Sequence, residues 1–317
     1  MPSWLLKTTV HHVLKALPHP EWWNGLMQRH VTRGLQLEPY GEFLDKLVAC
    51  RQHFRNYLSY STKPADRFSV IEVGTGWFPI IPIGLHLCGA KEVLTFDIAR
   101  LLQRDTFAMV VEYFCQFART GELYRVLPEA RVDLVSEFIR LAHSSKNLSP
   151  IEFLKCLRIR PVLGDVRALP VEDKSVDLVF SHGVLEHFPL QFLTQATAEF
   201  YRVCADSSIM SHFIGIKDQF SSFDHSITQF NNLRYSERAW QWLDSPIIPQ
   251  NRLRVSDYIH VFRNAGFEVS SREDIKAPES ELNKTKLSQE FLRYSRDELL
   301  VLYSWLVGCP RESQSAA

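Results

Sequence analysis

Residues 68–79 read FSVIEVGTGWFP, and this stretch organises the rest of the chain. Its first half is apolar and rich in β-branched residues, which is typical of a buried parallel strand. Gly74 and Gly76 follow at once, and glycine allows a left-handed backbone and the close approach of a ligand. Residues 80–88 predict a short apolar helix, and residues 91–96 predict a second strand that ends on Asp97. The stretch therefore predicts a strand, a glycine turn, a helix and a strand with an acid at its tip.

Such a unit suits a cofactor that carries a nucleoside. The helix after the turn offers unpaired N–H groups, and an acid at the tip of the second strand can accept hydrogen bonds from ribose hydroxyls. Asp97 lies 23 residues after Gly74, close to the spacing of about 20 for a ribose-binding acid. A dinucleotide fingerprint would need a third glycine where Pro79 stands. Glu72 would repel a pyrophosphate, and it suits a cofactor with a cationic amino-acid tail.

Two later segments extend this pattern. Residues 163–170 read LGDVRALP after a predicted strand at 160–163, and residues 175–187 read SVDLVFSHGVLEH. With the EVGTG turn and Asp97, these segments resemble the cofactor motifs of class I S-adenosylmethionine-dependent methyltransferases. The resemblance spans roughly residues 68–203 with a long interruption and resumes near Gly266. Many members carry a further glycine where this chain has Phe78.

The resemblance implies the cofactor S-adenosyl-L-methionine and an α/β fold. That fold is a doubly wound, mostly parallel, seven-stranded Rossmann-like sheet. The expected cofactor contacts lie at the ends of predicted strands: Glu72, Gly74, Thr75, Gly76, Asp97, Ile98, Asp165, Val166 and His182. Glu72 and the glycine turn would hold the methionine tail, and Asp97 the ribose hydroxyls. Asp97 could also cap a helix that starts at residue 98. Asp165, with the Val166 backbone, would meet the adenine, or would only close a turn after Gly164.

The catalytic residues are expected after the fourth strand, where the methyl group should point. An alcohol acceptor must lose a proton, and histidine is the commonest base near neutral pH. His187 and Glu186 are candidates there, although the pair could instead orient the loop. His225, in a later loop, is a second candidate base, and His212 lies inside a predicted strand as a core residue. The spacing of Asp218, Asp224 and His225 matches no specific metal site, so no metal is predicted.

Composition places the chain among ordinary globular proteins. Its 317 residues suggest one or two domains, and 36 Lys plus Arg balance 36 Asp plus Glu. This neutral balance gives no support for nonspecific nucleic-acid binding. The six cysteines contain no C-x-x-C pair, which fits reduced thiols in the cytoplasm. No signal peptide is evident, and no apolar run reaches the length of a membrane span.

The chain divides into an N-terminal helical lid region at 1–66, a cofactor domain at 67–309 and a flexible tail at 310–317. Within the lid region, helices are expected near residues 3–14, 21–34 and 40–58. A helical insertion at 98–159 is expected to close over the active site, because loops at the carboxyl ends of parallel strands surround the ligand. Residues 295–298 form a capping-box pattern. The apolar run after them could extend that helix or form a final strand, which the resemblance favours.

These expectations converge on a methyltransferase that acts on a small-molecule or sugar-containing metabolite, most readily at oxygen. The segment at 218–254 loosely resembles bacterial methyltransferases found among glycan and secondary-metabolite genes, which gives the hint about substrate class. Two alternatives stay open at this point: an NAD-type oxidoreductase, and a non-catalytic module with a methyltransferase-like fold. Neither a nucleic-acid partner nor a membrane span is expected.

Overall fold

The computed structural model describes residues 3–15, 37–144 and 147–311. Seven strands form one sheet in the order β3-β2-β1-β4-β5-β7-β6. Their bounds are β1 Ser69–Val73, β2 Glu92–Asp97, β3 Ile159–Leu163, β4 Val176–His182, β5 Cys204–Gly215, β6 Phe267–Lys276 and β7 Val301–Pro310. All neighbouring pairs are parallel except those of β7, which runs antiparallel to β5 and to β6. This is the predicted doubly wound, mostly parallel sheet of the Rossmann-like methyltransferase fold.

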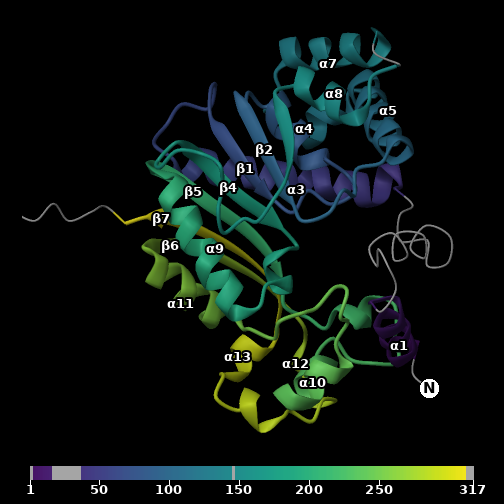
Figure 1. Cartoon of the computed structure of the whole chain (residues 1–317), viewed down its shortest axis with the longest axis vertical. Coiled ribbons are helices and arrows are strands. Elements are labelled where there is room, and N and C mark those ends of the chain that lie inside the picture. Colours follow the sequence, from purple (N-terminus) through teal and green to yellow (C-terminus); the bar gives the residue numbers. More distant parts are fainter. Residues whose placement is uncertain (1–2, 16–36, 145–146, 312–317) are drawn as a thin grey trace, which may run out of the picture.

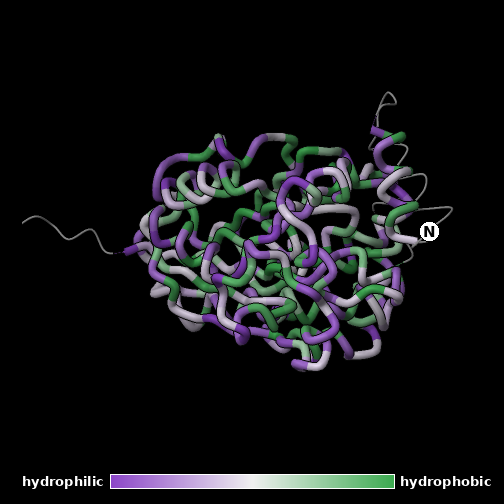
Figure 2. Tube along the Cα trace, turned by 90° about the horizontal axis from the view of Figure 1, so that it is seen from below, coloured by the Kyte–Doolittle hydropathy of each residue, from purple (hydrophilic) through white to green (hydrophobic). Residues whose placement is uncertain are grey.

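Helices cover both faces of the sheet (Figure 1). On one face lie α3 (Leu44–Tyr60) and α4 (Ile80–Leu87), and on the other lie α9 (Leu190–Val203) and α11 (Val255–Ala265). Successive residues of β1 point to opposite faces: Val70 joins the apolar cluster under α3 and α4, and Ile71 the cluster under α9 and α11. In Figure 2 the hydrophobic stretches lie mainly toward the interior, and hydrophilic stretches are most frequent at the periphery. Both clusters therefore anchor the ends of β1 and β4, where ligands bind in such folds.

The insertion after β2 is helical, as predicted. It contains α5 (Arg104–Thr120), α6 (Glu122–Val126), α7 (Val132–Ser144) and α8 (Pro150–Cys156). Phe114, Phe138 and Phe153 from these helices are buried in the same cluster as α3 and α4. The insertion thus widens one helical layer of the domain, and closure of this segment over a substrate stays a prediction.

A second group of short elements lies beyond the carboxyl ends of the strands (Figure 1). We call residues 216–254 and 277–300, together with α1 (Ser3–Lys15), the carboxyl-edge lobe. Its elements are η3 Gln219–Ser222, η4 Asn231–Arg234, α10 Glu237–Leu243, α12 Glu279–Asn283, η5 Gln289–Phe291 and α13 Arg296–Leu299. The lobe connects the end of β5 to α11 and the end of β6 to the start of β7. It therefore stands at the edge where the predicted site residues gather.

The N-terminal region contributes helices to two different parts of the molecule. Trp4 of α1 packs against Phe220 and Trp240 of the lobe, and its backbone N–H donates to Asp224 at 3.0 Å. In contrast, η1 (Pro39–Phe43) and α3 belong to the main body. The predicted helix at 21–34 lies outside the described residues, and a lid role for residues 1–66 stays a prediction.

The chain's C-terminal end differs from the expected tail. Ser295 caps α13, which has only four residues, and β7 begins at Val301, so the apolar run forms the strand rather than a longer helix. Pro310 still belongs to β7 because it pairs with Phe267, so the predicted start of the tail at residue 310 is too early. Residues 312–317 lie outside the described residues.

All six cysteines are free, and Cys50, Cys88 and Cys204 are buried. Within residues 3–15, 37–144 and 147–311, no helix is long and apolar enough to cross a membrane. In the same ranges, no three His, Cys, Asp or Glu side chains are grouped as a metal site would require.

Candidate active site

The two glycines of the turn meet different demands. Gly74 has φ +79°, its N–H donates to the Phe96 carbonyl at 2.8 Å, and a Cβ there would lie 2.5 Å from a methyl group of Val184. Gly76 has φ +66°, and a Cβ there would meet nothing within 4 Å. Both positions favour glycine because of their left-handed backbone. Gly74 also lets the turn pack against the loop after β4, whereas Gly76 leaves open space above it.

Glu72, at the end of β1, is a buried acid without a full set of partners. Its side chain is 4% exposed, and its Oε2 atom has no hydrogen-bond partner among the described residues. Burial raises its pKa to about 8, and the positive charge of Lys46 opposes that rise. A buried carboxylate oxygen normally finds a donor. A cationic ligand group against this free oxygen would favour the ionised carboxylate, so the position next to the glycine turn suits such a group.

Asp97 ties the tip of β2 to the turn. Its Oδ2 accepts from the Gly76 N–H at 3.0 Å, and its Oδ1 accepts from the Ala99 N–H at 3.1 Å. No helix starts at residue 98, because α5 begins only at Arg104. The alternative role of Asp97 as a helix cap is therefore wrong, and the side chain closes a short turn instead. Carboxylate oxygens have further lone pairs, so ribose hydroxyls could still bind.

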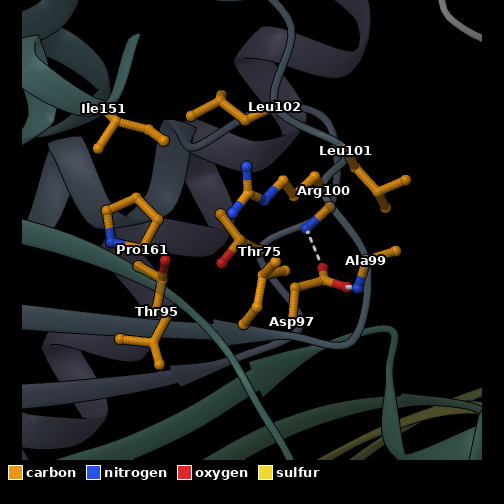
Figure 3. A pocket seen from close by; sticks show the side chains of 12 residues that line it. Thr75, Thr95, Asp97, Ala99, Arg100, Leu101, Leu102, Ile151 and Pro161 are labelled. Atoms are coloured by element: carbon orange, nitrogen blue, oxygen red, sulfur yellow. Dashed lines mark hydrogen bonds between the residues drawn. The ribbon is translucent and has the colours of Figure 1, made fainter.

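A cavity of about 200 Å³ lies beside Asp97 (Figure 3). It is formed by the glycine turn, the ends of β2 and β3, the start of the insertion and α8. Its lining residues are Thr75, Gly76, Thr95, Asp97, Ala99, Arg100, Leu101, Leu102, Ile151, Pro161, Val162 and Leu163. Figure 3 shows the Arg100 side chain reaching toward Thr75. Ile98 is not in this lining, and its side chain is 87% exposed.

Asp165 follows the end of β3, and its carboxylate is paired with a nearby arginine side chain. Its carboxylate binds the Arg167 side chain through Nε at 2.9 Å and Nη2 at 2.5 Å, and its Oδ1 accepts from the Arg167 N–H at 2.9 Å. These hydrogen bonds lower its pKa. The Val166 side chain is buried in the core, so only its backbone could meet a ligand. The structure thus has the turn that sequence offered as the alternative, and contact with adenine stays a prediction.

His182 is the last residue of β4, and its ring packs against aromatic side chains. The ring stacks on Phe213 of β5 with centroids 4.6 Å apart, and burial lowers its pKa to about 3. Its Nδ1 atom has no partner among the described residues. His182 is therefore neutral near pH 7 and has a polar atom left to bind a ligand.

Glu186 and His187 follow in η2 (Leu185–His187). Glu186 is 8% exposed, its Oε1 accepts from the Gly215 N–H at 3.1 Å, and its Oε2 has no partner among the described residues. Burial raises its pKa to about 7. The His187 Nδ1–H donates to the Pro249 carbonyl at 2.8 Å, and burial lowers the pKa of this ring. Because a carbonyl can only accept, the proton is on Nδ1 and the Nε2 lone pair is left available.

Asn251 of the carboxyl-edge lobe holds this loop in place. Its N–H donates to the Glu186 carbonyl at 2.7 Å, and its side-chain amide donates to the Leu185 and Phe188 carbonyls, both at 2.9 Å. The two expected roles of the loop are thus compatible. The lobe fixes its backbone, and each of the two side chains keeps one polar atom that has no partner among the described residues.

The other two histidines are separate from this group. His225 is exposed in the loop after η3, beside the Asp224 that binds α1. His212 is fully buried in β5, where its Nδ1 hydrogen-bonds to Ser181 at 2.8 Å. His212 is therefore the core residue that was predicted, and the role of His225 stays a prediction.

Helix α3 contributes residues that the sequence motifs did not reveal. His53 is fully buried, and its ring lies 5.8 Å from the His182 ring. Lys46 has its Nζ 5.9 Å from the centre of the Phe78 ring. Neither residue belongs to a motif, and both precede the glycine turn by about 20 residues or more. Only the packing of α3 onto the sheet brings them to the site.

Comparison with known families identifies one part of the chain. Residues 112–211 match the family model of a methyltransferase domain, which covers the chain from α5 to β5. The match agrees with the sheet order. The glycine turn, Glu72 and Asp97 lie outside the matched residues, so they are a separate observation. The chain therefore carries a methyltransferase domain. No curated protein matches this methyltransferase in sequence.

Solved structures resemble the methyltransferase only distantly. A TehB-like SAM-dependent methyltransferase from Corynebacterium glutamicum is 13% identical, with a TM-score of 0.39 over 82% of this chain and 87% of that chain. A geranyl diphosphate C-methyltransferase from Streptomyces coelicolor, crystallised with S-adenosyl-L-homocysteine, is 9% identical, with a TM-score of 0.46 over 82% and 79%. A putative sarcosine dimethylglycine methyltransferase from Galdieria sulphuraria is 13% identical, with a TM-score of 0.45 over 82% and 85%. At such low similarity, these structures carry no argument about the acceptor.

The residues present fit the cofactor of the family. The free Glu72 oxygen suits the ammonium group of the methionine tail, and the open space at Gly76 leaves room for the tail itself. Asp97 provides carboxylate oxygens beside the cavity for hydroxyl groups. S-adenosyl-L-methionine is therefore the cofactor of this methyltransferase, and these contacts are the ones we expect it to make.

Proposed function

We propose that this methyltransferase methylates an oxygen of a small-molecule or sugar-containing metabolite, with His187 as the general base. When bound, the cofactor supplies an activated methyl carbon. The protein then has to hold the acceptor in line and take up the proton of its hydroxyl group.

The observation that carries the proposal is the fixed tautomer of His187. The hydrogen bond to Pro249 keeps the proton on Nδ1, so the unprotonated Nε2 is the atom that can accept another. Burial lowers the pKa of His187, which keeps the ring neutral and basic near pH 7. Glu186, next in the loop, has one carboxylate oxygen bound to the Gly215 N–H and one free to orient a hydroxyl group.

Charge supports a small acceptor. The chain carries 36 basic and 36 acidic residues, so a polyanionic acceptor would find no overall attraction. The carboxyl-edge lobe reaches the catalytic loop directly through Pro249 and Asn251. Because the lobe borders the loop on which His187 stands, we assign acceptor selection to it.

The test uses labelled methyl transfer to a panel of hydroxyl, amine and thiol metabolites, with mass spectrometry to locate the added methyl group. His187→Asn keeps an amide that can donate to Pro249 but lacks the basic nitrogen. We expect it to lower turnover by about 10² to 10⁴ and to leave S-adenosyl-L-homocysteine binding unchanged in calorimetry. Asp97→Ala should instead lose cofactor binding.

The variant His225→Ala provides the matched control, because it tests the second candidate base. We expect this variant to keep full turnover. Loss of turnover in His225→Ala with full activity in His187→Asn would overturn the assignment of the base. A methyl group found on nitrogen, carbon or sulfur would overturn O-methylation.

A further inference from the structure

Lys46 lies outside the parallel sheet, near Phe78 at the end of the glycine-turn segment. It lies on α3 about two turns before His53, and the His53 ring contacts the His182 ring at the end of β4. The distance of 5.9 Å from its Nζ to the Phe78 ring centre places the ammonium group near Phe78, two residues after Gly76.

The Lys46 ammonium group is held only loosely. Its ion pair with Glu42 spans 3.8 Å, and the two side chains are 26% and 39% exposed. A surface pair of this kind contributes little energy. Its charge also acts at the ends of two strands. Burial raises the pKa of Glu72 and lowers that of His182, and Lys46 opposes the first shift and adds to the second. Lys46 is thus a weakly paired cation whose charge acts on the Glu72 carboxyl group.

We propose that Lys46 binds the carboxylate of the cofactor's amino-acid tail, so that Lys46 and Glu72 together recognise a zwitterion. The tail carries one ammonium and one carboxylate group, and the site offers one free carboxylate oxygen and one loosely held ammonium group. The inference deepens the proposed function and rests on its cofactor, not on its acceptor. It also makes α3, from the predicted lid region, a part of the cofactor site.

The experiment compares two ligands that differ only in the group Lys46 would bind. S-adenosyl-L-homocysteine has the carboxylate, and decarboxylated S-adenosylhomocysteine keeps the amine but lacks it. Calorimetric titration of the native chain should show at least tenfold weaker binding of the decarboxylated ligand. In Lys46→Met we expect S-adenosyl-L-homocysteine to bind at least tenfold more weakly and the decarboxylated ligand to bind within twofold of native.

Two further variants control for indirect effects. Lys46→Arg keeps the charge and should retain most of the affinity, whereas Lys155→Met removes an exposed lysine of α8 and should change neither ligand. Lys46→Gln repeats the test with a polar side chain if Lys46→Met folds poorly, which circular dichroism would reveal.

The remaining outcomes overturn either the inference or the cofactor assignment on which it rests. Equal weakening of both ligands in the Lys46 variants would mean that Lys46 only supports the structure. Unchanged binding of S-adenosyl-L-homocysteine, or a native chain that does not distinguish the ligands, would place the carboxylate elsewhere. If the native chain bound neither ligand, the cofactor assignment itself would fail, which is a separate result.

Discussion

The ends of β1 and β3 both carry acids that sequence motifs mark as cofactor ligands, yet the two acids are in opposite states. Glu72 after β1 is buried and has a free oxygen. Asp165 after β3 is exposed, and the Arg167 guanidinium occupies its carboxylate. Burial raises the pKa of Glu72, and the Arg167 hydrogen bonds lower that of Asp165. A sequence motif thus predicts the residue type at a position, but the residue's hydrogen-bond partners in the folded protein determine whether it is available to a ligand.

Glu72→Gln should give a large effect, with opposite signs for stability and binding. The folded protein keeps a proton on Glu72 up to a pKa of about 8, whereas the unfolded chain releases it near 4.5. The free energy of unfolding of the native chain therefore falls as pH rises through this window. A neutral glutamine avoids that loss, so we expect the ligand-free variant to be about 3 kcal/mol more stable at pH 7. Urea denaturation at pH 5, 7 and 8 measures the difference.

Binding should move the other way in the same variant. Loss of a hydrogen bond to a charged group costs about 1.5–3 kcal/mol, so S-adenosyl-L-homocysteine should bind at least tenfold more weakly to Glu72→Gln. A variant that binds as tightly as the native chain would show that the free Glu72 oxygen is not a ligand site. Equal stability of variant and native chain across this pH range would show that Glu72 is not protonated when buried.

The two glycines of the turn extend the comparison to the backbone. Gly74→Ala places a methyl group against Val184 at a left-handed φ, so we expect a loss of about 2–4 kcal/mol in stability. Gly76→Ala has the backbone strain without the clash, and should lose only about 1 kcal/mol. Its methyl group enters the space for the cofactor tail, so this variant should lose ligand affinity instead. Denaturation and calorimetry on both variants separate the two effects.

Val184→Ala tests the origin of the Gly74 effect. Adding it to Gly74→Ala removes the methyl groups that a Cβ at position 74 would strike, and should restore part of the lost stability. If it restores none, backbone strain alone explains the loss, and the distinction between the two glycines is wrong.

Local patterns in the sequence predicted most of the fold. Runs of β-branched residues marked the strands, Gly266 ended α11 with a left-handed φ of +108°, and Ser295 capped α13. These features act over a few residues, so a sequence can reveal them. The Asp165–Arg167 pair was also readable in principle, because the two residues stand only two positions apart.

Long-range packing explains what the sequence could not predict. Lys46 comes near Phe78 only because α3 packs on the sheet, and Asn251 holds the loop of His187 from a distant part of the chain. Amphipathic helices in the insertion could have faced the carboxyl edge or the body. Phe114 and Phe138 are buried in the same cluster as α3 and α4, so these helices of the insertion pack against the body of the domain. A periodic apolar face predicts that a helix will be buried, but does not name the surface that buries it.

Asp165→Asn should have the smallest effect and completes the comparison of the two acids. The pair with Arg167 is exposed, with side chains 44% and 42% accessible, so its loss should change stability by less than about 1 kcal/mol. Asparagine keeps an oxygen that can accept from the Arg167 N–H, so the turn at the end of β3 should persist. We expect less than a threefold change in S-adenosyl-L-homocysteine affinity, measured beside Glu72→Gln under the same conditions. A tenfold loss would mean that Asp165 leaves Arg167 to bind the ligand, and that partners seen in the free protein do not decide which acid is available.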